Sequence, residues 1–331
     1  MIVVLSCVVG STLRGSSPAG ATPAAATDEV RRTAGVESLV QRNDTVWEAV
    51  VHAPTMHTDI PMHILRPKGA PSGAPILYLL NGAGGGEDGA NWLAQTDVVD
   101  FFADKFVNVV IPDKGIGSYY TDWVADDPVV GRPMWQTFLT EELPAVLDNA
   151  LGANGRSAIA GLSMSATSVL NLAIAAPERY RAVASYSGCA QTSTPEGEAA
   201  VRGIVYVAAG ANADNMWGPA GSPRWARNDP YLHAEKLRGT SLYLSSGSGV
   251  AGQYDTRENQ APGAPPVENQ ILVGGALEAA TRHCTEAMAH RLAALRIPAV
   301  VHLPSTGTHS WQYWRDELHR SWPTIDAGLR S

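Results

Sequence analysis

The apolar residues of this chain fall into short runs that alternate with amphipathic stretches. Residues 74–80 and 106–111 are nearly continuous apolar runs, as expected of strands buried on both faces. Further strands are predicted at residues 47–52, 62–65, 157–160, 182–185, 204–208, 241–244 and 299–303. Helices are predicted at residues 138–151, 166–176, 276–295 and 311–321, with a kink at Pro144 in the first of them.

This order of elements predicts an α/β protein. Strands that alternate with helices form a mostly parallel central sheet with helices on both faces, here after two opening antiparallel strands. Residues 247–266 are rich in Gly, Pro and polar residues and predict a surface excursion. We expect residues 28–331 to form a single domain, because α/β folds often exceed about 250 residues.

The N-terminal residues predict export. Residues 2–9 are apolar, and the small-residue stretch that follows ends near residues 24–26, which resembles a signal peptide with an Ala-rich cleavage region. No Lys or Arg precedes Arg14, so a flexible Ala/Pro/Ser tail without a targeting role is the alternative. We assign residues 1–27 to a signal peptide or flexible N-terminal segment and expect a secreted or cell-envelope protein.

Composition and charge exclude several kinds of partner. The net charge is −8 and no Lys/Arg cluster occurs, so nucleic acid is not an expected partner. Nothing after the N-terminus approaches the roughly 18 apolar residues of a membrane span. Neither a Cys/His ligand spacing nor a dinucleotide fingerprint is present, so we expect no metal and no organic cofactor.

The chain has three cysteines, Cys7, Cys189 and Cys284. If Cys7 leaves with a signal peptide, an even pair remains in an oxidising compartment. We therefore predict a disulfide between Cys189 and Cys284. The alternative is a pair of buried thiols that pack as small apolar groups.

A serine stands at a predicted strand-to-helix junction. The segment Gly161-Leu162-Ser163-Met164-Ser165 follows the strand at 157–160 and leads into the helix that begins at 166. This is the setting of the nucleophile elbow of α/β-hydrolases, although the usual final glycine is a serine here. The alternative is a chance Gly-x-Ser before an ordinary helix. As a nucleophile, Ser163 would need a histidine base and an acid further along the chain.

Nine histidines and several acids are available. In α/β-hydrolases the chain order is Ser, acid, His, with the histidine on the loop after the last strand. His309 fits this place, and His302, inside the predicted last strand, is its rival. For the acid, Asp255 is suggested by its place soon after strand 241–244. Spacing alone also leaves three glutamates open: Glu258, Glu268 and Glu278.

Several long, mostly aromatic-bearing blocks occur in a fixed order and carry a resemblance. They lie at residues 75–82, 118–123, 135–144, 161–174, 186–188, 215–219, 225–230 and 307–314, the last beginning Gly307-Thr308-His309-Ser310-Trp311. These blocks resemble the secreted mycolyltransferases of mycolic-acid-bearing actinobacteria, the antigen 85 family. The resemblance covers about residues 45–322.

The resemblance implies a catalytic triad. It places the nucleophile at Ser163, the base at His309 and the acid at Glu278, in the helix before the last strand, in preference to Asp255. The same helix carries Cys284, which suits the predicted disulfide. The oxyanion hole is expected to use two backbone N–H groups, one from Met164 after the nucleophile and one from Ala83 after strand 74–80.

The resemblance also implies a substrate. The donor would be an acylated trehalose, and the acceptor a hydroxyl of trehalose or cell-wall arabinogalactan, in a mycolate-rich envelope, with the enzyme a monomer. The family has an Asp where Asn81 stands and an Arg near Gly84, both associated with trehalose, so these sugar contacts differ here. Asn81 and Trp311 remain the candidate substrate-binding residues.

Two other functions fit the same residues. A secreted carboxylesterase would use the same triad with water as the acceptor. An inactive carbohydrate-binding envelope protein on the same fold is the third possibility, which an intact Ser163, His309 and candidate acid argue against.

Overall fold

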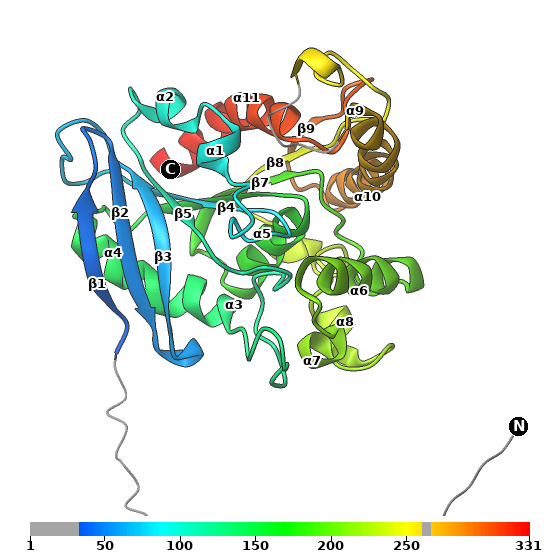
Figure 1. The fold of residues 1–331 in the computed structure, drawn as a ribbon, viewed down its shortest axis with the longest axis horizontal. Helices are drawn as coiled ribbons and strands as arrows, with labels where there is room; N and C mark the ends of the chain where they lie inside the picture. The colour runs from blue at the N-terminus through cyan, green and yellow to red at the C-terminus, as the bar shows by residue number, and fades with distance from the viewer. Residues whose placement is uncertain (1–32, 260–265) are drawn as a thin grey trace, which may run out of the picture. The chain divides into compact units, whose positions relative to one another are not determined.

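The computed structural model describes residues 33–259 and 266–331, so the predicted N-terminal segment 1–27, including Cys7, lies outside the described residues. Within this part the chain forms one nine-stranded sheet in the order β1-β2-β3-β5-β4-β6-β7-β8-β9. Figure 1 shows the sheet running through the molecule with helices on either side. The predicted α/β class is thereby confirmed.

The first strands form the antiparallel side of the sheet. β2 (Val46–Ala53) pairs with both β1 (Gly35–Gln41) and β3 (Thr58–Leu65), and β3 pairs with β5 (Asn108–Pro112), all antiparallel. β2 and β3 correspond to the predicted opening strands. β1 was not predicted, because as an edge strand of exposed and half-buried residues it has no apolar run.

The rest of the sheet is parallel. It contains β4 (Ile76–Leu80), β6 (Ser157–Leu162), β7 (Tyr180–Tyr186), β8 (Ser241–Ser245) and β9 (Val300–His302). β4 pairs in parallel with β5 on one side and with β6 on the other. The parallel pairing then continues from β6 to β7, β8 and β9. The carboxyl ends of the parallel strands therefore meet at one edge, which is where open α/β sheets place their ligands.

Two apolar clusters fill the two faces of the sheet. Along β4, Tyr78 packs in one cluster, whereas Leu77 and Leu79 pack in the other, as the two-residue period of a strand requires. Helices α3 (Trp135–Thr137), α4 (Leu143–Leu151), α5 (Met164–Ala175), α6 (Pro195–Ala209) and α10 (Gly275–Ala294) contribute to the first cluster. Helices α1 (Trp92–Gln95), α2 (Val98–Phe102) and α11 (Trp311–Arg330) contribute to the second. In Figure 1, α1, α2 and α11 lie on one side of the sheet and α4 on the other.

The remaining helices of the described residues are α7 (Ala213–Trp217), α8 (Pro223–Arg227) and α9 (Val267–Asn269). Short helical turns of π or 3-10 type are found at Pro54–Met56, Phe138–Glu142, Ala234–Leu237, Arg257–Asn259 and Gln270–Gly274.

The strand predicted at residues 204–208 is wrong, because these residues form the last turns of α6. The helix starts with strong signals: the Thr194 side chain accepts from the Gly197 N–H at 3.0 Å, and Pro195 follows it. Residues 204–208 resemble a strand in the sequence because apolar side chains occur on the solvent-facing side of the helix as well as on its buried side. Tyr206 and Val207 are 70% and 84% exposed.

Pro144 lies inside one continuous helical stretch, because α3 (Trp135–Thr137), a π-type turn and α4 (Leu143–Leu151) follow one another without a break. The kink at Pro144 stays a prediction. The π-type turn, Phe138–Glu142, precedes Pro144, and its closing bond joins the Leu143 N–H to the Phe138 carbonyl. Pro144 then lies in the first turn of α4. Proline has no N–H to donate to the preceding turn, and a π-type turn next to a proline is a common irregularity in helices.

Candidate active site

Ser163 lies in the sharp turn between β6 and α5, with backbone angles φ 54° and ψ −122°. Such a conformation is costly for a residue with a side chain, and it persists only where the surroundings enforce it. The Ser163 N–H donates to the Tyr186 carbonyl at 2.9 Å. The turn is so tight that a Cβ on Gly161 would lie 2.6 Å from the Ser165 Oγ. The predicted strand–turn–helix junction is therefore present.

Ser165 occupies the position where the usual elbow motif has glycine. It is fully buried, and its Oγ accepts the Leu162 N–H at 2.9 Å. The same hydroxyl can donate to the carbonyl of Leu162 at 3.0 Å or of Leu80 at 3.2 Å. Because Leu80 ends β4, this side chain ties the elbow to the strand that leads into the loop of Ala83.

The structure brings Ser163, His309 and Glu278 together. The His309 Nε2 lies 2.8 Å from the Ser163 Oγ, and its Nδ1 lies 2.7 Å from the Glu278 Oε2. His309 stands on the loop between β9 and α11, and its ring packs perpendicular to the Trp314 ring at 4.8 Å. An imidazole held between a hydroxyl and a carboxylate can take a proton from the hydroxyl.

Glu278 projects from α10 into a ring of donors at the ends of β7 and β8. Its Oε1 accepts from the Ser187 Oγ at 2.7 Å, the Ser246 Oγ at 3.0 Å and the Gly247 N–H at 2.5 Å. With His309 on Oε2, this buried carboxylate has four donors. Removing a side chain from water is costly unless its polar atoms are paired, and here both oxygens are paired.

The loop after β4 lies beside the elbow. A Cβ on Gly82 would lie 3.8 Å from the Cβ of Ser163. The neighbouring Ala83 carbonyl accepts the Gly117 N–H at 2.8 Å, whereas its own N–H has no acceptor within residues 33–259 and 266–331. Met164 is the first residue of α5, where a backbone N–H has no intrahelical partner.

The two candidate substrate-binding residues lie in different surroundings. Asn81 is fully buried; its Nδ2 donates to the Pro112 carbonyl at 3.0 Å, and its Oδ1 accepts the Trp92 N–H at 3.3 Å. Its polar atoms are thus engaged inside the protein. Trp311 is half-buried, between the rings of Trp92 and Trp314, each with its centroid at 5.5 Å.

The rival residues have other partners. Asp255 accepts from four donors, none of which is His309. His302 pairs through Nδ1 with Glu317 at 2.8 Å. Glu268 is exposed and pairs with Arg257 at 2.6 Å, and Glu258 is an exposed residue on the same short turn. The carboxylate beside His309 is therefore that of Glu278.

Sequence reasoning missed the donors around Glu278. Ser187 directly follows β7, Ser246 directly follows β8, and Gly247 is the next residue after Ser246. Because these strand ends meet at one edge of the sheet, a polar residue immediately after each buried strand was a usable signal.

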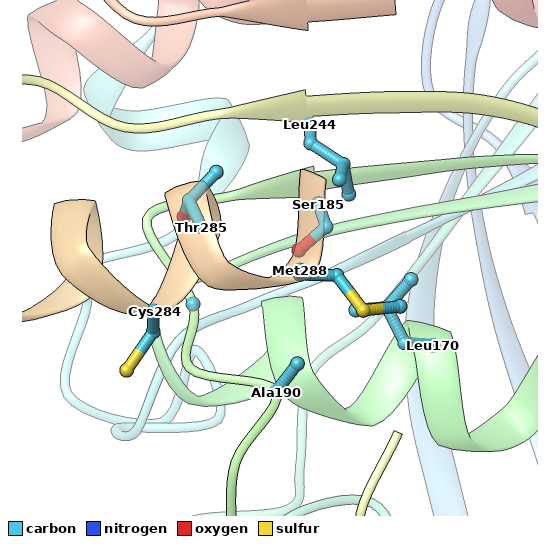
Figure 2. A pocket seen from close by; sticks show the side chains of 8 residues that line it. Leu170, Ser185, Ala190, Leu244, Cys284, Thr285 and Met288 are labelled. Atoms are coloured by element: carbon cyan, nitrogen blue, oxygen red, sulfur yellow. The ribbon is translucent and has the colours of Figure 1, made fainter. Parts of the chain in front are cut away.

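A disulfide joins Cys189, after β7, to Cys284 on α10, the helix that carries Glu278. Figure 2 shows the small pocket beside Cys284, lined by Leu170, Leu244 and Met288 among others. Its two hydroxyls are already in use: Ser185 donates to the Ala166 carbonyl and Thr285 to the Thr281 carbonyl. We interpret this pocket as a packing gap behind α10.

Replacing both Cys189 and Cys284 by serine is expected to lower the free energy of unfolding by about 4–5 kcal/mol. The crosslink spans 95 residues, and the chain-entropy treatment gives a stabilisation of this size for so long a loop. Urea unfolding of the wild type and the double variant measures the difference, with reduced wild type as the control. Equal unfolding midpoints would contradict the expectation.

Residues 33–259 and 266–331 contain no group of three or more His, Cys, Asp or Glu that could hold a metal ion. In the same part of the chain, no helix combines the length and the apolar character needed to cross a bilayer.

Comparison with known proteins places the chain. Residues 53–325 match the family described as putative esterase. The chain is 31% identical over 292 residues to the diacylglycerol acyltransferase/mycolyltransferase Ag85A of Mycobacterium tuberculosis, covering 84% of this chain and 80% of the relative. It is 31% identical over 266 residues to Ag85B of Mycobacterium leprae, covering 78% and 77%.

Solved structures share the fold. The crystal structure of Mycobacterium tuberculosis MPT51 (FbpC1) matches with a TM-score of 0.68 and 24% identity, covering 84% of this chain and 96% of that one. An S-formylglutathione hydrolase from Agrobacterium tumefaciens matches with a TM-score of 0.62 and 17% identity, covering 88% and 98%.

The sheet order, the elbow and the relatives together define an α/β-hydrolase and an enzyme of the serine-hydrolase type. Within that class the chain belongs to the antigen 85 family, whose relatives are named diacylglycerol acyltransferase/mycolyltransferase. The resemblance read from the sequence blocks is thereby confirmed.

Proposed function

We propose that this enzyme transfers a long-chain mycoloyl group from a trehalose ester to a sugar hydroxyl through an acyl-enzyme on Ser163. The observation that carries the proposal is the continuous hydrogen-bond chain Ser163–His309–Glu278, at 2.8 and 2.7 Å, in a member of the antigen 85 family. The mycoloyl group and the transfer reaction are inferred from relatives named mycolyltransferase.

Acylation begins when the Ser163 oxygen attacks the ester carbonyl while the His309 Nε2 takes the serine proton. The carbonyl oxygen becomes an oxyanion, which the N–H groups of Met164 and Ala83 stabilise as it forms. The carbon–oxygen bond to the sugar then breaks, and the imidazolium returns the proton to the leaving sugar oxygen.

Deacylation reverses these roles. An acceptor hydroxyl loses its proton to His309, its oxygen attacks the Ser163 ester, and the Ser163 oxygen leaves and regains the proton. Throughout, Glu278 accepts the Nδ1–H of His309, which fixes the tautomer and stabilises the imidazolium. Transfer instead of hydrolysis requires the acceptor sugar to be positioned better than water.

At the expected acceptor subsite this chain departs from the family pattern. Where the family has an arginine near residue 84, this chain has glycine, and the carboxylate of Asp88 occupies the space where a side chain at 84 would begin. Asn81 is buried, so among the candidate residues Trp311 is the one we assign to stacking on a sugar. This difference favours a second candidate function, a carboxylesterase with water as the acceptor.

Product analysis separates the two functions. Incubation with a long-chain monoacyl trehalose is expected to yield diacylated trehalose and free trehalose. Added isotope-labelled trehalose competes as the acceptor, so labelled monoacyl trehalose is expected to appear while the amount of diacylated product falls. The Ser163→Ala variant gives the background. Free fatty acid as the sole product, at every trehalose concentration, would overturn the transferase proposal in favour of the esterase.

We further propose that the protein works outside the cytoplasm, as a monomer, in a mycolate-rich envelope, and that residues 28–331 act as one catalytic domain. The Cys189–Cys284 bond supports an oxidising compartment. The single sheet formed by the described residues supports one domain.

A further inference from the structure

The segment at residues 246–259, which follows β8, contacts both Glu278 and the loop that carries His309. At its start, the Ser246 Oγ and the Gly247 N–H donate to Glu278. A little further on, the Gly249 N–H donates to the Gly307 carbonyl at 2.8 Å, and the Gly307 N–H donates to the Val250 carbonyl at 2.7 Å. These two bonds attach the segment to the loop of His309.

Asp255, in the same segment, is an acid with no assigned role. It is only 7% exposed, and each of its oxygens accepts two hydrogen bonds. Oδ1 accepts from the Thr308 Oγ1 at 2.5 Å and the Gln270 Nε2 at 2.7 Å. Oδ2 accepts from the Tyr313 hydroxyl at 2.7 Å and the Gly252 N–H at 2.7 Å.

Three of these four donors belong to residues around His309. Thr308 precedes the base directly, and Tyr313 lies in the first turn of α11, just beyond it. Gln270 also reaches the Ser310 Oγ, at 3.4 Å, on the other side of the base. One carboxylate thus connects to the residue before His309 and, through Gln270, to the residue after it.

The charge of Asp255 suits this arrangement. Burial acts to raise the pKa of the Asp255 carboxyl, but the hydrogen bonds from Thr308, Gly252, Tyr313 and Gln270 outweigh it, so the pKa is lowered overall. An ionised carboxylate is acceptor-only, which matches a site built entirely of donors.

We propose that Asp255 is a positioning residue of the acyl-transfer reaction: by accepting from Thr308, Gln270 and Tyr313, it fixes the loop that places the His309 imidazole between Ser163 and Glu278. The proposal rests on the proposed role of His309 as the base. Under this proposal, segment 246–259 holds both Glu278 and the loop of His309 in place. The sequence of the segment, read as a surface excursion, did not indicate this role.

Two variants test this role. Asp255→Asn keeps the shape of the side chain but replaces one acceptor oxygen with an amide NH₂. This donor would face the donors that the carboxylate oxygen accepts from. Thr308→Val keeps the shape of residue 308 and removes its donor hydroxyl. Asp127→Asn is the matched control, because Asp127 is also buried and accepts from four donors: the N–H groups of Val129, Val130 and Asn212 and the Asn215 Nδ2. The loop that contains Asp127 carries no residue of the proposed triad.

Three readouts separate positioning from general stability. The first is kcat and KM for a soluble short-chain ester, the second is the rate at which a fluorophosphonate probe labels Ser163, and the third is the downfield proton resonance of the His309 Nδ1–H. Thermal unfolding of each variant is recorded alongside, so that a change in activity can be compared with the change in stability.

Asp255→Asn and Thr308→Val are expected to lower kcat and the labelling rate by up to about 100-fold, as a displacement of about 1 Å costs in other sites, with KM unchanged. The downfield resonance is expected to broaden or shift in both. Asp127→Asn is expected to lose stability and to keep its kcat and resonance.

The inference is overturned if both variants keep the wild-type kcat, or if Asp127→Asn loses as much kcat as they do. Should Asp255→Asn fail to fold, Thr308→Val alone decides. Failure of the acyltransferase proposal is distinguishable, because it appears in the wild type: free acid as the only product leaves the role of Asp255 intact, whereas an unlabelled Ser163 overturns both.

Discussion

Ser163→Ala is expected to lower kcat for ester turnover by about 10⁴-fold to 10⁶-fold. The variant keeps the elbow and the two backbone N–H groups of the proposed oxyanion hole but has no oxygen to attack the ester. Loss of the serine in enzymes with such a triad costs about this much, and the remaining rate comes from the oxyanion hole and binding. Turnover of a soluble ester and titration with a fluorophosphonate probe measure the effect.

The matched control for this variant is Ser168→Ala, one turn further along α5. Ser168 is a buried serine whose hydroxyl donates to the Met164 carbonyl at 3.2 Å and does not reach His309. It is expected to keep its activity and its labelling. A Ser163→Ala enzyme that retains more than about 1% of the wild-type kcat would disprove the nucleophile, given the magnitudes above.

Glu278→Gln is expected to lower kcat by about 10⁴-fold, the size of effect that the acid-to-amide change has in a comparable triad. The donors from Ser187, Ser246 and Gly247 require an acceptor, so the amide oxygen will face them. The amide NH₂ must then face the His309 Nδ1, which has to accept. The opposite tautomer follows, with the proton on Nε2 pointing at Ser163, and the imidazole is no longer a base toward the serine.

A second histidine–carboxylate pair supplies the control. Glu317 lies outside the proposed site. It pairs with the His302 Nδ1 at 2.8 Å and accepts a hydrogen bond from the Tyr243 hydroxyl at 2.6 Å. Glu317→Gln therefore makes the same chemical change in a similar pair, and it is expected to leave kcat unchanged. The role of Glu278 is refuted if Glu278→Gln and Glu317→Gln have equal activity.

Much of the fold was predictable from the chain because the inner parallel strands β4, β6 and β8 are short, mainly apolar and almost fully buried. β4, β6 and β8 all fall within a residue or two of their predicted positions. The errors have local causes. The apolar run at residues 204–208 is helical, since Thr194 and Pro195 start a helix upstream and its last turns expose apolar residues to solvent.

Two of the three triad residues could be predicted from the sequence alone, and the acid could not. Ser163 and His309 could be proposed because a strand-to-helix turn and a loop after the last strand are local features of the sequence. The acid could not be chosen from spacing, because what distinguishes Glu278 from Asp255 is three-dimensional. Both are buried carboxylates with four donors, and only the packing of α10 against the ends of β7 and β8 directs one of them at the imidazole. The family resemblance supplied that choice.

Three hydroxyl groups of the proposed site come from the carboxyl ends of adjoining parallel strands: Ser163 follows β6, Ser187 follows β7, and Ser246 follows β8. The chemistry is thereby confined to one rim of the sheet. Connections at the opposite rim can change in length over evolution without disturbing it. A slip of β8 by a single residue would turn Ser246 to the other face and leave the acid without that partner. Divergence within such proteins should therefore gather at the far rim, while the pairing register near the catalytic rim stays fixed.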